Sequence, residues 1–228
     1  GTANRIIEIN PDLIIFKYWM PFFAPSFGTI IKKVKRNLNT KALVICDNII
    51  PHEGRPLDKL LTKYFFNNID YFIVMSRSVE ADLLSLYPGA DSLYTPHPLC
   101  DIFGATIKKD TAKISLGITE QKVLLYFGLI RPYKGLDLLI NAAKLLIQKL
   151  DNYKILAVGD CYENPEPYSD LVKENGVNDV FDLRMEFIPN DKVNLYFSAA
   201  DVVVLPYKSA TQSGVVPIAY HFNKPVIV

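Results

Sequence analysis

Short apolar runs alternate with segments of helical period along nearly the whole chain, and this alternation constrains the fold more than any other feature. The strand-like runs are Leu13–Phe16, Ala42–Cys46, Tyr71–Met75, Leu93–Thr95, Val123–Phe127, Tyr153–Val158, Val202–Leu205 and Val226–Val228. Several are apolar almost throughout, which is typical of strands buried on both faces of a parallel sheet. Strand, helix and strand in repetition indicate right-handed βαβ units, so the predicted fold class is α/β with doubly wound parallel sheets.

The segments between these runs have the spacing of amphipathic helices. The sequence predicts helices at Val79–Leu86, Leu136–Leu150 and Lys192–Ala200. In the second of them we expect one face to pack on the sheet, formed by Leu138, Leu139, Ala142, Leu145, Leu146 and Leu150.

The periodic pattern lapses between Pro96 and Gly117, where the chain is first proline-rich and then polar. We therefore expect a domain boundary near residue 108, with one domain over residues 1–108 and another over residues 109–228. The chain closes on an apolar run at Val226 with no turn after it, and it opens one helix-like stretch before its first strand. Two Rossmann-like domains, both incomplete, are the predicted architecture.

Composition narrows the class of protein further. Apolar residues make up 50% of the 228 residues and charged residues 21%, which is a globular composition. Lys and Arg (25) nearly balance Asp and Glu (24), so we expect no nucleic-acid partner. The three cysteines are widely spaced with no C-x-x-C, which argues against a zinc site and favours a reducing, cytoplasmic setting. No apolar run approaches the roughly 20 residues that span a bilayer.

The most informative stretch is VLLYFGLIRPYKGLDLLI, which begins at Val123. A buried strand runs into Gly128, whose missing side chain lets a ligand approach the backbone. Arg131 and Lys134 follow on a short loop before the predicted helix. Because ligands of open α/β sheets bind beyond the carboxyl ends of the strands, this position suits a diphosphate. The alternative interpretation is that both cations are solvated loop residues and that Gly128 only turns the chain.

A second stretch, ADVVVLPYKSATQSGVVPIAYHFNKPVIV, repeats the order of buried strand, polar loop, small residues and helix. Ser213 and Gly214 are expected at the start of that helix, which makes a second place for an anionic or hydroxyl-rich ligand. The alternative is simple capping of the helix by Thr211 or Ser213.

The two stretches together resemble the retaining family-4 glycosyltransferases of the GT-B fold. The segments DNIIPHEGRPLDKLL, DYFIVMSRSVEADLLSLYP and TPHPLCDIF are similar to the second half of that family's acceptor domain and to its linker. The resemblance covers nearly the whole chain. It implies transfer of a sugar, with retention, from a nucleotide diphosphate donor to a glycan or lipid-linked acceptor, in cell-envelope or extracellular polysaccharide biosynthesis at the cytoplasmic side.

The resemblance also implies roles for single residues. The domain at residues 109–228 would bind the donor, with Arg131 and Lys134 holding the diphosphate. The backbone from Ser213 through Gly214 to Val215 would approach the sugar or phosphates. Ile188, within Glu186–Pro189, would lie near the base, and His52 would orient the sugar or acceptor from the other domain. No metal and no other cofactor is expected, because the two cations supply the positive charge.

One departure from the family pattern keeps a second class of function open. The family usually has two glutamates, eight positions apart, whereas Ala210–Phe222 contains no carboxylate. Either Gln212 and Ser213 take over the sugar contacts, or activity is reduced or lost. The alternative functions are therefore a non-catalytic glycosyltransferase-like binding subunit and, more remotely, a sugar-nucleotide epimerase.

An aromatic stretch from Phe16 to Phe27 precedes a basic cluster of Lys32, Lys33, Lys35 and Arg36. Basic residues near exposed aromatic rings suit the surface of an anionic membrane, which makes a peripheral membrane contact one interpretation. The other is that the aromatic rings pack in the core and the basic residues form a solvated face.

Overall fold

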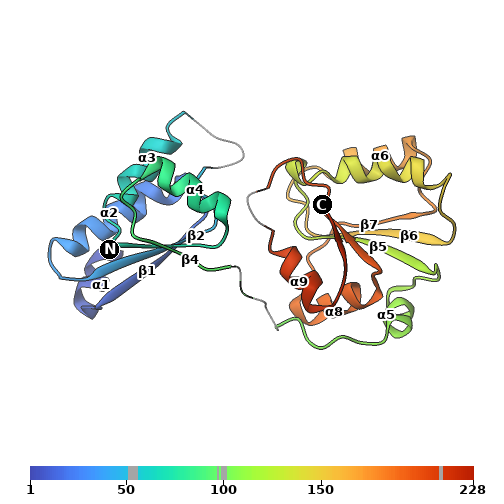
Figure 1. Cartoon of the computed structure of the whole chain (residues 1–228), viewed down its shortest axis with the longest axis horizontal. Helices are drawn as coiled ribbons and strands as arrows, with labels where there is room; N and C mark the ends of the chain where they lie inside the picture. Colours follow the sequence, from blue (N-terminus) through green and yellow to red (C-terminus); the bar gives the residue numbers. More distant parts are fainter. Residues whose placement is uncertain (51–55, 97, 99–101, 211–212) are drawn as a thin grey trace. The chain divides into compact units, whose positions relative to one another are not determined.

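The computed structural model describes residues 1–50, 56–96, 98, 102–210 and 213–228. The chain divides into two compact units, Gly1–His97 and Pro98–Val228, which we call the first and second unit. Each unit is built on a parallel β-sheet with helices between successive strands (Figure 1). The prediction of α/β architecture with two Rossmann-like domains is confirmed.

The sheet of the first unit has the strand order β1-β2-β3-β4. Its strands are β1 (Leu13–Tyr18), β2 (Lys41–Cys46), β3 (Tyr71–Val74) and β4 (Ser92–Tyr94). The helical elements are α1 (Thr2–Ile9), η1 (Pro21–Phe23), α2 (Ala24–Lys35), α3 (Asp58–Phe66) and α4 (Arg77–Leu86). One core joins the sheet to these helices, with Phe16, Val44 and Val74 of the strands packed with Ile31 and Phe65.

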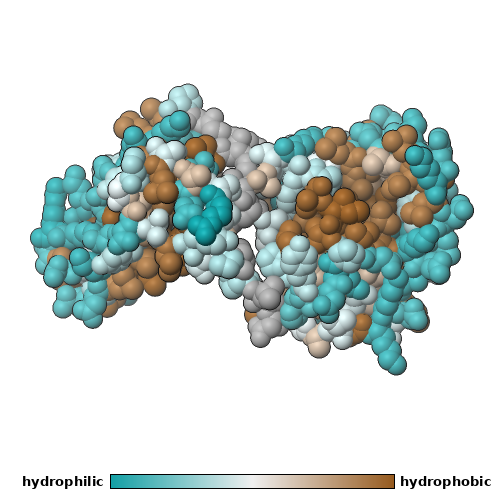
Figure 2. All heavy atoms as spheres, viewed as in Figure 1, coloured by the Kyte–Doolittle hydropathy of each residue, from teal (hydrophilic) through white to brown (hydrophobic). Residues whose placement is uncertain are grey.

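The opposite face of this sheet is largely apolar and is exposed or half-buried. Successive strand residues point to opposite faces, so Leu13 and Ile15 lie on the other side of β1 from Phe16. Leu13 is 45% exposed, Ile15 59%, Tyr71 41% and Leu93 64%, and none of them belongs to a core of the described residues. Hydrophobic atoms are visible along the sheet side of this unit in Figure 2. Within the described residues, the first unit thus buries its sheet on one side.

Substitutions on the two faces of the first sheet should therefore lower the free energy of unfolding by different amounts. Ile15→Thr is expected to change the free energy of unfolding by no more than about 0.5 kcal/mol, as is usual for exposed positions. Val44→Thr places a hydroxyl without a partner in the core and is expected to cost about 1–3 kcal/mol. Urea unfolding of the two variants measures the contrast, and equal losses would show that the exposed face is buried in solution.

The second unit has the strand order β7-β6-β5-β8-β9. Its strands are β5 (Lys122–Phe127), β6 (Tyr153–Val158), β7 (Phe181–Arg184), β8 (Val202–Val204) and β9 (Val226–Ile227). The helical elements are α5 (Lys109–Leu116), η2 (Pro132–Lys134), α6 (Leu136–Leu146), α7 (Glu166–Glu174), α8 (Asn190–Ala199) and α9 (Val215–His221). One core packs against α5, α8 and α9, and a second packs against α6 and α7, so this sheet is covered on both faces.

The prediction for the buried face of α6 is confirmed only in part, since Leu139 is buried and Leu146 and Leu150 pack against the core. Leu138 and Leu145, predicted to pack on the sheet, are 47% and 63% exposed. The buried residues of the helix are Leu136, Leu139, Ile140 and Ala143. This set has the spacing i, i+3, i+4, i+7 counted from the first helical residue, and in so leucine-rich a segment two overlapping stripes satisfy the period.

The division between the units falls before Pro98, earlier than the boundary we expected near residue 108. Phe103 and Ile107 pack against the core of the second unit. The Ile107 N–H donates to Ser198 Oγ at 3.1 Å, and Asn194 Nδ2 donates to the Ala105 carbonyl at 3.2 Å. The polar composition of this segment conceals these attachments, which need the folded α8 to form.

Candidate functional site

The strand order of the second unit contains one switch point. From β5 the chain adds β6 and β7 on one side of the sheet and then returns to add β8 and β9 on the other. Loops that follow the strands on either side of such a point leave in opposite directions and open a crevice at the carboxyl edge, where ligands of open α/β sheets bind. The loops concerned are residues 128–135, after β5, and residues 205–214, after β8.

Lys134 lies at this point with its ammonium group partly removed from water. Its Nζ is 5.6 Å from the centre of the Tyr207 ring and 3.7 Å from where a Cβ on Gly128 would stand. No carboxylate in the described part of the chain is within salt-bridge distance of Nζ. Because burial disfavours the charged form, the pKa of Lys134 is lowered from its ordinary value. An anion bound beside Gly128 would compensate the Lys134 ammonium for the hydration that it loses on burial.

Tyr207 connects Lys134 to the start of α9. Its hydroxyl lies 3.2 Å from Ser213 Oγ, and that oxygen also accepts the N–H of Val215 at 3.3 Å. A side chain of Val215 comes within 3.4 Å of the Cβ position on Gly128, which has a φ of +110°. Burial raises the pKa of Tyr207, so its hydroxyl keeps its proton at neutral pH. The structure therefore brings Gly128, Lys134, Ser213 and Val215 together, and adds Tyr207.

Sequence reasoning missed Tyr207. The available signal was an aromatic residue with a polar tip directly after the Leu205-Pro206 strand end, on the same edge as the predicted diphosphate site.

Further contacts hold the loop after β8 against the loop after β5 and the first turn of α6. The Lys208 N–H donates to the Tyr133 carbonyl at 2.8 Å, and Lys208 Nζ pairs with Asp137 Oδ2 at 2.7 Å. Gly135, between η2 and α6, has a φ of +68° and packs directly against the Pro206 carbonyl. The position of Lys134 is thus set by its own loop and by the loop after β8.

Arg131 points to the other side of β5. Its Nη1 donates to Glu163 Oε1 at 2.8 Å, and its guanidinium carbon lies 5.7 Å from the centre of the Tyr162 ring. Both partners belong to the loop after β6, which is tied to the Arg131 loop by the Ile130 N–H donating to the Asp160 carbonyl at 2.8 Å. The two predicted diphosphate cations therefore share one loop, while one faces the β6 loop and the other the β8 loop.

The other predicted site residues have no described contact with Lys134 or Tyr207. Gly214 is exposed, with open space where a side chain would be, so the structure gives no steric reason for a glycine there. Ile188 is half-buried against the core that also holds Val215. His52 and Gln212 lie outside the described residues.

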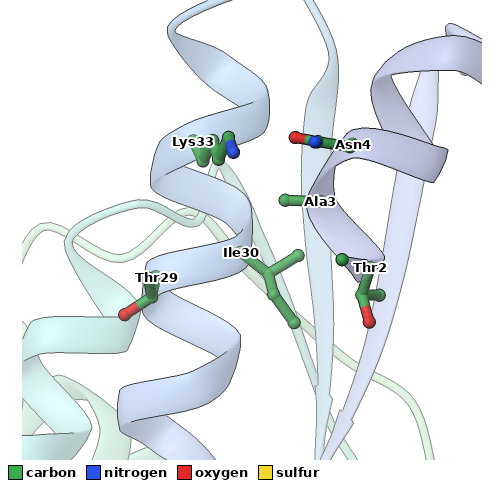
Figure 3. Close-up of a pocket in the computed structure, with 7 residues that line it drawn as sticks. Thr2, Ala3, Asn4, Thr29, Ile30 and Lys33 are labelled. Atoms are coloured by element: carbon green, nitrogen blue, oxygen red, sulfur yellow. The ribbon is translucent and has the colours of Figure 1, made fainter.

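Two cavities of the described structure lie elsewhere. One, of about 230 Å³, separates α1 from α2, and Ala3 and Ile30 face each other across it (Figure 3). The other, of about 320 Å³, is lined by Glu120, Tyr153 and Val180 at the amino edge of the second sheet. Neither includes a predicted site residue. Among the residues described, no group of three or more His, Cys, Asp or Glu side chains is placed to hold a metal ion.

In the aromatic stretch of the first unit some rings are buried and others are exposed, so each of the two interpretations fits part of it. Phe16 and Phe27 pack in the core with ring centres 5.4 Å apart, whereas Trp19 is 43% and Phe22 73% exposed. Of the basic cluster, Lys35 pairs with Asp70 at 2.6 Å. None of the described helices has both the length and the apolar character that crossing a membrane requires.

Comparison with known proteins finds a family match within the second unit. Residues 121–228 match the family described as "Glycosyl transferases group 1", over the same segment that holds the switch-point loops. These residues form a group 1 glycosyltransferase domain. The chain is 26% identical to the D-inositol 3-phosphate glycosyltransferase of Corynebacterium aurimucosum, over 89% of this chain and 51% of that protein. It is 29% identical to the lipopolysaccharide 1,2-N-acetylglucosaminetransferase of Salmonella typhimurium, over 59% of this chain and 37% of that protein.

Solved structures that resemble the chain share its fold. Sucrose-phosphate synthase from Thermosynechococcus elongatus matches 99% of the chain and 57% of its own length, with a TM-score of 0.79 and 20% identity. HepE of Anabaena, solved in complex with UDP, matches 99% of the chain and 61% of its own length, also at a TM-score of 0.79, with 15% identity. The group 1 glycosyltransferase domain and the first unit thus have the GT-B fold. The chain spans about half the length of the D-inositol 3-phosphate glycosyltransferase of Corynebacterium aurimucosum.

Proposed function

We propose that this chain is part of a glycosyltransferase that transfers a sugar, with retention, from a nucleoside diphosphate donor to a glycan or lipid-linked acceptor. The observation that carries the proposal is the convergence of Lys134, Tyr207 and Ser213 beside Gly128 at the switch point of a group 1 glycosyltransferase domain. An ammonium group with a lowered pKa and no carboxylate beside it among the described residues suits a polyanionic ligand.

In this proposal each side chain has a chemical task. Lys134, and Arg131 once it turns to the crevice, bind the diphosphate and stabilise the negative charge that develops as it leaves the sugar. The Tyr207 and Ser213 hydroxyls hydrogen-bond to phosphate or sugar oxygens, and Gly128 leaves room for them. Ile188 borders the base, and His52 contributes from the first unit. These side chains, without a metal, provide the charge that the reaction needs.

The proposal also includes the cellular setting of the reaction. We place the reaction in cell-envelope or extracellular polysaccharide biosynthesis at the cytoplasmic face of a membrane. Trp19 and Phe22, exposed just before the amino end of α2, would contact that surface together with the basic residues in the last turn of the helix. The curated relatives named above act on an inositol phosphate and on lipopolysaccharide.

One observation favours a second candidate, a non-catalytic binding subunit. The segment Ala210–Phe222 contains no carboxylate, so no acidic side chain follows β8 to bind the sugar or the ribose. Both candidates bind a nucleoside diphosphate, and turnover of the nucleotide-sugar distinguishes them.

Calorimetric titration of UDP, GDP and ADP tests the donor site. We expect one of them to bind, and Arg131→Ala to weaken it by about 1.5–3 kcal/mol, or roughly 10- to 150-fold in Kd, as for a lost charged hydrogen bond. Lys144→Ala, which removes an exposed cation from the far part of α6, serves as the control and should bind as the wild type does. Failure of every nucleotide to bind, or equal affinity in all three proteins, would refute the donor site.

A further inference from the structure

The Arg131–Glu163 pair stands where the proposed function needs a free guanidinium. Arg131 Nη1 and Glu163 Oε1 are 2.8 Å apart, and the two side chains are 35% and 45% exposed. Within the described part of the chain Glu163 pairs with no other cation, and its partner is one of the two side chains expected to hold the donor. A carboxylate here competes with phosphate oxygens for the same donor groups.

The backbone keeps this carboxylate close to Arg131. Ile130 and Cys161 form a parallel bridge between the loops after β5 and β6. The Gly128 N–H donates to the Val158 carbonyl at 2.9 Å, and the Ile130 N–H to the Asp160 carbonyl at 2.8 Å. Glu163 follows this paired segment directly, with its own carbonyl accepting a 3.5 Å contact from Cys161 Sγ. The paired loops bring the carboxylate to Arg131, while the exposed side chain itself can swing away into solvent.

Among the described residues, the neighbouring cation Lys134 has no such partner. Lys134 faces the loop after β8, where Tyr207 and Ser213 carry no charge. An incoming diphosphate thus meets one unpaired ammonium and one guanidinium already engaged. Because a diphosphate carries more negative charge than one carboxylate and presents several oxygens to the planar guanidinium, it is the stronger partner for Arg131.

We propose that Glu163 is a counter-ion of Arg131 that the diphosphate of the donor displaces, so that Glu163 limits how tightly the site holds nucleoside diphosphates. The inference rests on the proposed function. It makes Glu163 a positioning residue, which acts on the ligand through Arg131. Its effect should accordingly be present only when Arg131 is present.

Calorimetric titration of UDP, GDP and ADP into Glu163→Gln tests the inference. The variant should bind the nucleotide that the wild type binds with about two- to fivefold higher affinity, the scale of removing a half-exposed ion pair. Glu166→Gln is the matched control, because it removes the same charge from the exposed start of α7 without touching Arg131. We expect its affinity to equal that of the wild type.

The Arg131→Ala background separates competition from general repulsion. There Glu163→Gln should bring no gain, since the contact it removes is already gone. Equal gains from Glu163→Gln and Glu166→Gln, or weaker binding by Glu163→Gln, would overturn the inference and leave the donor site intact. If neither the wild type nor Glu163→Gln binds any of the three nucleotides, the donor site and the inference are both overturned.

Discussion

Gly135→Ala is expected to lower the free energy of unfolding by about 2–4 kcal/mol and to disturb the candidate site at the same time. Two costs add. With a φ of +68°, the backbone at Gly135 is in the left-handed region that a Cβ disfavours. The added Cβ would also stand far inside contact distance of the Pro206 carbonyl oxygen, which is backbone and has no flexible end that could move aside.

The second unit offers a matched control in Gly176→Ala. Gly176 follows α7 with a φ of +65°, and nothing lies within 4 Å of its Cβ position. It should therefore lose only the conformational part, about 1 kcal/mol. Thermal and urea unfolding of both variants measure the difference. Equal losses would contradict the close contact between the loops after β5 and β8, on which the position of Lys134 depends.

The contact at Gly135 also links stability to binding. In Gly135→Ala the Pro206 loop must retreat from η2, which moves the Tyr207 ring away from Lys134. Nucleoside diphosphate binding, measured well below the unfolding transition, should weaken in this variant and stay unchanged in Gly176→Ala.

The strands were largely predictable, and the one that was missed shows why. Eight apolar runs each coincide with a strand, because a strand covered on one or both faces must be apolar at least at every second residue. β7 was missed since Phe181 and Leu183 alternate with Asp182 and Arg184. It lies at the edge of the sheet, where Arg184 Nη2 pairs with Asp182 at 2.7 Å and also donates to the Leu116 carbonyl at 2.8 Å. A short edge strand with two charges carries no apolar signal.

The composition of the candidate site was predictable in part. Gly128, Lys134 and Ser213 each follow an apolar run, and the carboxyl ends of parallel strands meet at one edge, so their proximity follows from sequence once the strand order is known. The order itself does not follow, because β8 adds to β5 only after β6 and β7 have taken the other side. For the same reason the sequence could not show that Arg131 would face Glu163 while Lys134 faces Tyr207. Side-chain direction depends on which loop lies on which side.

Lys134→Met is expected to reduce release of nucleoside diphosphate from the nucleotide-sugar by about 10²–10³-fold while leaving the protein at least as stable. The loss follows from the proposed role, since the ammonium would stabilise charge that grows as the leaving group departs. Met is one atom shorter than Lys, but it keeps an unbranched apolar side chain and removes the charge. The stabilising direction follows from the structure, because an ammonium partly removed from water without a carboxylate partner in the described chain costs free energy.

The pH dependence of the free energy of unfolding tests whether Lys134→Met stabilises the protein. Desolvation lowers the pKa of Lys134 in the folded protein, so the unfolded chain holds this proton more tightly. Stability therefore rises with pH in the window between the lowered pKa and the ordinary lysine value, and at neutral pH, where both states are protonated, the wild type carries the full cost. Lys134→Met removes both the desolvation cost of the ammonium and the rise of stability with pH. Urea unfolding at neutral and alkaline pH should show a more stable variant at neutral pH and convergence of the two proteins at alkaline pH.

Lys144→Met separates a specific effect from a general one, since it removes an equally charged but exposed side chain of the same unit. It should alter neither turnover nor the pH profile of stability. A Lys134→Met protein that is inactive because it is less stable would mean that the ammonium has a structural partner, and the donor-site role would lose its main support. Inactivity combined with higher stability has no structural explanation other than a charge kept for a ligand, because a side chain retained for folding alone would not be improved by losing its charge.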